Sequence, residues 1–157
     1  MSLKDWASNG WLSELAATAE DIAHLFHVAQ RDLRTAKGVD DSDWTFNIAY
    51  NAVLKLATVP LYAEGYRADK MNNHYRTFQA IPLIIGKEQK ASAAYLDKCR
   101  QKRNSATYDR VAVVSKKEAK ELIDFAEEFK EVITTWLDEK HPELAAKVRS
   151  ELKTIED

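Results

Sequence analysis

The segment from Trp44 to Ala63 is the feature that most constrains the fold of this chain. Drawn as a helix, it is apolar around most of its circumference, and a helix of that kind is buried on several sides. Its apolar residues are Phe46, Ile48, Ala49, Ala52, Val53, Leu54, Leu56, Ala57 and Val59. We therefore expect a central helix that ends near Gly65, kinked or shortened by Pro60, with the other elements packed around it.

Other segments carry apolar residues at intervals of three and four, the spacing of one helix face. One stripe consists of Ile22, Phe26, Ala29, Leu33 and Ala36, and another of Ala119, Leu122, Ala126, Phe129, Ile133 and Trp136. Further helices are expected from near Asn73 and from about Glu88, and Ser115 to Glu118 has the spacing of a capping box. The pattern predicts an all-α protein, an up-and-down bundle of five or six helices.

Composition indicates an ordinary globular chain. Its 157 residues include only 4 Gly and 3 Pro, and this length fits one domain. We expect a single domain over residues 1–157, with an N-terminal anchor at about 1–12 and an amphipathic helix at about 142–156. The sequence has neither a secretory apolar segment nor a membrane-spanning run, so we expect a cytoplasmic protein. The single Cys99 excludes an internal disulfide and a metal site of the CxxC type.

The stretch from Lys98 to Arg110 has the strongest local charge. It contains five cations and one acid, a local charge of +4 in a chain of net charge −2. Such a cluster attracts phosphates, and arginine adds a planar fork that suits phosphate oxygens. The residues expected to contact phosphates are Lys98, Arg100, Lys102 and Arg110. A solvated helix face is the alternative interpretation of the same charges.

Within this stretch, Arg103-Asn104-x-x-x-Tyr108-Asp109 resembles the motif of the HEPN family of small helical domains. The family motif has Arg, then a polar residue, then His some positions later, and Tyr108 stands at the place of that His. The resemblance extends over roughly residues 10 to 140. It includes Asp43-Trp44-x-Phe46-x-Ile48-Ala49-Tyr50-Asn51, Gly65-Tyr66-Arg67 and His74-Tyr75.

The resemblance implies an RNA-cleaving toxin or defence activity that needs no metal or other cofactor, in which the ribose 2′-hydroxyl attacks the neighbouring phosphate. Arg103 would stabilise the phosphate, Asn104 would position it, and Tyr108 would assist as a hydrogen-bond or proton donor. It also implies a homodimer, with a cognate antitoxin or nucleotidyltransferase as a further partner. Two alternatives stay open: a HEPN domain that binds RNA or protein without cutting, and a basic surface helix without such a role.

Four polar residues of the central helix, Asn47, Asn51, Lys55 and Thr58, fall on one narrow strip with Tyr50 beside them. Buried polar groups need partners, because an unsatisfied one costs on the order of 1 to 3 kcal/mol. We therefore expect the strip to face the Arg103 site. The supporting residues of that site are expected to be Tyr50, Asn51, His74 and Asp109. His74 lies near a helix start, which disfavours its charged form, and a capping or surface role is its alternative.

Other site classes find no support in the sequence. It has no glycine-rich phosphate loop, no Gly-x-Ser-x-Gly turn and no His-Glu-x-x-His metal pair.

Overall fold

The computed structural model describes residues 1–109 and 114–156, with side chains for 1–104 and 114–156. In chain order the elements are α1 (Leu3–Ser8), β1 (Leu12–Glu14), α2 (Ala19–Lys37), α3 (Ser42–Ala63), β2 (Tyr66–Ala68), α4 (Asn73–Ile84), the 3-10 helix η1 (Lys87–Gln89), α5 (Lys90–Asp109), α6 (Lys116–Lys140) and α7 (Pro142–Glu156). The all-α prediction is confirmed. The described residues form seven α-helices rather than five or six, because α1, expected as a short turn, is an α-helix with a Ser2–Asp5 capping box.

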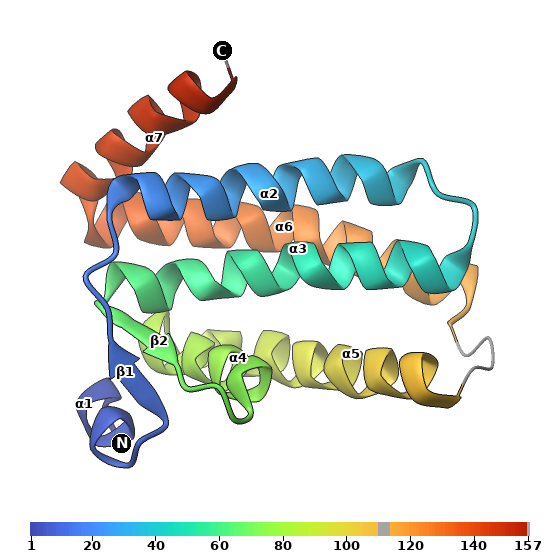
Figure 1. Ribbon diagram of the computed structural model, residues 1–157, viewed down its shortest axis with the longest axis horizontal. Helices are drawn as coiled ribbons and strands as arrows, with labels where there is room; N and C mark the ends of the chain where they lie inside the picture. The colour runs from blue at the N-terminus through green and yellow to red at the C-terminus, as the bar shows by residue number, and fades with distance from the viewer. Residues whose placement is uncertain (110–113, 157) are drawn as a thin grey trace.

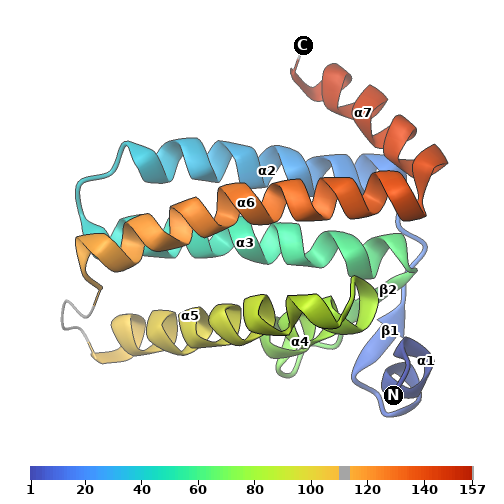
Figure 2. The same cartoon turned by 180° about the vertical axis from the view of Figure 1, so that it is seen from behind.

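Helix α3 lies at the centre, as its apolar circumference predicted. It packs against α2 and α6 on one side and against α4 and α5 on the other (Figures 1 and 2). Among the side chains that the structure describes, the largest fully buried one, Tyr50, belongs to this helix. Pro60 is buried within α3, and the helix continues to Ala63. The central helix therefore presents its residues to both halves of the bundle.

The two strands were not expected. β1 and β2 pair antiparallel, with Leu12 opposite Ala68 and Glu14 opposite Tyr66. Each strand has only three residues, which is too short to produce the alternating pattern by which strands are recognised. The ribbon ties the N-terminal segment to the connection between α3 and α4 (Figure 1). That connection starts at Gly65, whose positive φ of 89° suits glycine.

The N-terminal tryptophans attach the first segment to α4. Trp6 is buried in a small apolar cluster with Leu12, Leu61 and Ala80. The guanidinium of Arg76 lies 3.8 Å from the ring centre of Trp11, within the range of a cation–π contact. The start of α4 is thereby held beside the ribbon.

The start of α6 is fixed by the predicted capping box. The Glu118 amide donates to Ser115 Oγ at 3.0 Å, and the Ser115 amide donates to Glu118 Oε1 at 3.0 Å. Glu118 also forms an ion pair with Lys102 of α5, 3.3 Å away. One carboxylate thus caps α6 and ties it to the basic helix.

Among the described residues, none of the helices is both apolar enough and long enough to cross a lipid bilayer.

Replacing Ser115 by alanine should lower the free energy of unfolding by about 1 kcal/mol, the usual loss at an N-cap. Urea denaturation followed by circular dichroism measures this change. Ser150→Ala is the control, because Ser150 is exposed within α7, where alanine suits the helix at least as well as serine. Equal stability of the two variants would contradict the capping role.

Candidate functional site

Arg103 of α5 contacts Asn47, one of the four residues of the predicted polar strip of α3, and Tyr50 beside that strip. Its Nε donates a hydrogen bond to Oδ1 of Asn47 at 3.2 Å. Its guanidinium carbon lies 5.1 Å from the ring centre of Tyr50. The guanidinium is therefore held on the central helix by a hydrogen bond and by the aromatic ring.

The same tyrosine contacts His74. Its hydroxyl lies 3.0 Å from Nδ1 of His74, at the first turn of α4. The Tyr50 ring is fully buried, packed edge-on against Phe78 of α4. Tyr50 therefore joins three helices, with its ring under Arg103 of α5 and its hydroxyl bonded to His74 of α4. We call Tyr50, His74 and Arg103 the tyrosine cluster.

Burial and positive charge together shift the titration of this cluster. Burial lowers the pKa of His74, and the charges of Arg103, Arg100 and Lys55 lower it further. The neutral form of the imidazole is thereby favoured. The causes are burial and neighbouring cations, whereas the sequence analysis expected the helix start to be the cause. Burial raises the pKa of Tyr50 far above its ordinary value, so its phenol stays protonated.

The remaining cations of the basic stretch have different surroundings. Arg100 forms an ion pair with Asp97 at 2.8 Å, and Lys102 pairs with Glu118. Lys98 is exposed on α5. Acids from outside the stretch therefore compensate part of the charge of +4.

Several predicted site residues lie away from the tyrosine cluster or outside the described side chains. Asn51 is exposed on α3, and Asn104 is partly buried on α5, one position after Arg103. The backbone of Tyr108 and Asp109 belongs to α5, but their side chains lie outside the described part of the chain, as does all of Arg110. The roles predicted for these three residues stay predictions.

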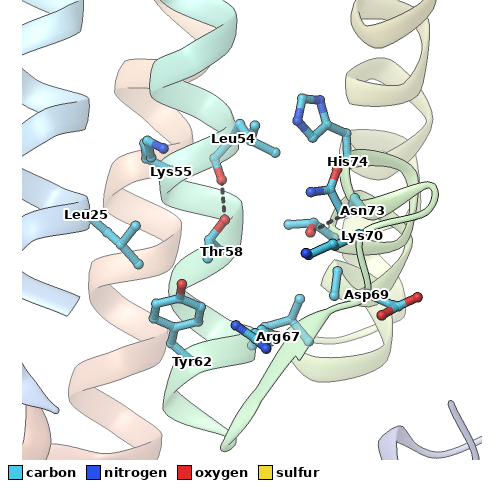
Figure 3. A pocket seen from close by; sticks show the side chains of 13 residues that line it. Leu25, Leu54, Lys55, Thr58, Tyr62, Arg67, Asp69, Lys70, Asn73 and His74 are labelled. Atoms are coloured by element: carbon cyan, nitrogen blue, oxygen red, sulfur yellow. Dashed lines mark hydrogen bonds between the residues drawn. The ribbon is translucent and has the colours of Figure 1, made fainter. Parts of the chain in front are cut away.

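A cavity of about 430 Å³ opens beside His74 (Figure 3). Its lining comes from α2, α3, β2, the following connection and the start of α4. The charged and titratable residues among the lining are Lys55, Tyr62, Arg67, Asp69, Lys70 and His74. His74 therefore belongs both to the tyrosine cluster and to the lining of the cavity.

Within residues 1–104 and 114–156, no three His, Cys, Asp or Glu side chains are grouped as a metal site would require. Cys99 is buried, and burial raises the pKa of its thiol to about 11. A thiol of that pKa is almost wholly protonated at pH 7 and is a poor nucleophile. The side chains available for chemistry here are thus a neutral imidazole and several cations.

Sequence reasoning put Asn47 and Tyr50 beside Arg103 and left His74 open between a supporting role there and a capping or surface role. It did not predict which of these residues contact one another. The hydrogen bond between Tyr50 and His74 joins residues 24 positions apart, and no periodicity reports such a contact. Arg67 was named only as part of the HEPN-like resemblance, and neither Arg67 nor Lys70 was predicted to be a site residue, although both line the cavity. The signal that could have indicated a site here was the presence of two cations, Arg67 and Lys70, soon after the end of the central helix.

Comparison of the chain with protein-family models, with curated proteins and with solved structures gave no match. The functional argument therefore depends on the geometry of the tyrosine cluster and on the HEPN-like motif.

The His74 imidazole should titrate below its ordinary pKa of about 6.5, and Arg103→Gln should bring that pKa closer to the ordinary value. The reason is that the guanidinium of Arg103 is the largest charge contribution to the lowered pKa. Histidine resonances followed by NMR across pH 4 to 8 measure both values. Lys98→Gln, the same charge change at an exposed site of the same helix, should leave His74 unchanged. A His74 that titrates above 6.5 would refute this electrostatic account.

Proposed function

We propose that the protein is a metal-independent endoribonuclease of HEPN-like toxin or defence type. The observation that carries the proposal is the position of Tyr50, whose hydroxyl is hydrogen-bonded to His74 and whose ring lies against the guanidinium of Arg103. This arrangement puts a neutral base and a permanent cation in one site. Attack of a 2′-hydroxyl on the adjacent phosphate needs both groups.

In the proposed reaction, His74 acts in the tautomer that donates its Nδ1 proton to the Tyr50 oxygen. Its Nε2 then accepts the proton of the ribose 2′-hydroxyl. The 2′-oxygen forms a bond to phosphorus while the bond from phosphorus to the 5′-oxygen breaks, and that oxygen takes a proton from water. The products are a 2′,3′-cyclic phosphate and a 5′-hydroxyl, and the imidazolium returns its proton to solvent.

The cations have a complementary role in this proposal. Negative charge grows on the phosphate oxygens in the transition state, and Arg103, with Arg100 and Lys55 near His74, would stabilise it. The same cations keep His74 unprotonated at neutral pH, which a base requires. Tyr108 is then a helper rather than the base, which removes the difficulty that a phenol of pKa about 10 poses for that role.

A non-catalytic HEPN domain that binds RNA or a protein is the second candidate, including a partner of a nucleotidyltransferase. The observation that favours it is the compensation of Arg100 by Asp97 and of Lys102 by Glu118. Ion pairs of this kind are ordinary structural contacts on helix surfaces. These ion pairs reduce the positive electrostatic potential along α5 that would attract an RNA strand.

We also propose a two-fold homodimer that brings two Arg103 regions together, in cytoplasmic surroundings. The position of α5 supports this arrangement, since it packs against α4 and α3 at one edge of the bundle (Figure 2). Its outward side carries exposed residues such as Lys98 and Gln101. A second copy facing α5 would add its cations to the same strand of RNA.

Wild-type protein should cut single-stranded RNA in the presence of EDTA and leave 2′,3′-cyclic phosphate ends. His74→Gln should lower the rate by about 10² to 10⁴, and Arg103→Gln by about 10² or more. Because the pKa of His74 is lowered, the rate should begin to fall only below about pH 6.5. A fluorescent oligonucleotide assay over pH 5 to 8 measures these rates.

Lys147→Gln is the matched control for that assay, because Lys147 is an exposed cation on α7, and it should leave the rate unchanged. If the wild-type protein leaves RNA intact with and without metal, the nuclease proposal fails. Binding of uncut RNA would then favour the non-catalytic domain.

A further inference from the structure

The cavity beside His74 contains an uncompensated concentration of positive charge. Lys55 of α3, Arg67 of β2 and Lys70 of the following connection line it, with Asp69 as the only acid in its lining. Among the described residues, none of the three cations forms an ion pair, unlike Arg100 and Lys102 on α5. The excess charge is therefore available to an anion from solvent.

The side chains are arranged to receive such an anion. In Figure 3, Arg67 and Lys70 extend from β2 and its following connection toward the α3 side of the cavity, while the Asp69 carboxylate points away from them. Lys55 lies across from Lys70, on α3. The Tyr62 hydroxyl faces the same space. Cations from three separate elements thus surround a volume of about 430 Å³.

Two residues connect this cavity to the tyrosine cluster. His74 lines the cavity and accepts or donates the hydrogen bond to Tyr50. Lys55 lines the cavity, and its charge contributes to the lowered pKa of His74. A strand whose reacting phosphate lies at Arg103 and His74 would therefore have the cavity beside it, on the His74 side.

From this placement we infer that the cavity is a second phosphate-binding subsite, which holds the phosphate next to the one that reacts. The inference rests on the proposed function, and it names the substrate class as single-stranded RNA with at least two successive phosphates. Guanidinium and ammonium groups both bind phosphate oxygens, the first as a planar fork and the second as a point charge. Specificity for the base is not required, since phosphate contacts carry no sequence information.

The test uses 2′-O-methyl oligonucleotides, which keep the phosphates but lack the attacking hydroxyl. Fluorescence anisotropy at low salt compares a trinucleotide with two phosphates and a dinucleotide with one. The wild-type protein should bind the trinucleotide about tenfold more tightly, the effect of one charged hydrogen-bonded contact. The double variant Arg67→Ala/Lys70→Ala should bind both oligonucleotides alike.

Matched variants separate a local contact from a change in net charge. Lys147→Ala/Lys153→Ala removes two exposed cations of α7 and should keep the tenfold preference. Arg67→Lys/Lys70→Arg keeps both charges and should keep most of it. Because Arg67 and Lys70 are exposed, thermal unfolding should show the alanine variant as stable as the wild type.

The remaining outcomes decide between the sources of the phosphate. If the alanine variant retains the preference for the trinucleotide, the subsite is overturned. Inorganic phosphate is also added as a competitor of the oligonucleotides. The subsite is overturned as well if the only change in the alanine variant is that inorganic phosphate no longer competes, because the cavity would then hold a free anion. If the wild-type protein prefers the trinucleotide through Arg67 and Lys70 but never cuts RNA, the nuclease proposal fails and the subsite stands.

Discussion

The hydrogen bond between Tyr50 and His74 is the contact on which the candidate site depends. It joins the central helix to the start of α4 at 3.0 Å, and the same phenol ring lies 5.1 Å from the Arg103 guanidinium. Because Tyr50 is fully buried, its ring has little freedom to move within the packed core. A rigid aromatic side chain thereby holds an imidazole and a guanidinium that come from different helices, and the proposed reaction needs this kind of preorganisation.

The surroundings of this contact explain why it has chemical consequences. Burial and the charges of Arg103, Arg100 and Lys55 lower the pKa of His74. Asp97 forms an ion pair with Arg100, so the acids near the site compensate only part of its positive charge. In the proposed function, an RNA strand would supply the negative charge that balances the excess cations. The uncompensated cations of the neighbouring cavity extend the same imbalance beyond the reacting phosphate.

Much of the fold could be predicted from apolar spacing, because each long helix buries a stripe or, for α3, nearly its whole surface. The Ser115 capping box and the meeting of Asn47 with Arg103 were predicted for the same reason: local spacing and the cost of burying unpaired amides are properties of the sequence. The strands β1 and β2 were missed because three residues carry no periodicity. The place of His74 was left open, since only tertiary packing brings it to a residue 24 positions away.

The central claim is that His74 and Arg103, both held in place by Tyr50, act together on the same RNA phosphate. A double-mutant cycle on RNA cleavage tests this claim most directly. The cycle compares kcat/KM for the wild type, His74→Gln, Arg103→Lys and the double variant. If the two residues act on one transition state, the double variant should lose little more than the worse single variant, as for catalytic groups that work together. Losses that simply multiply would mean independent roles and would contradict the account.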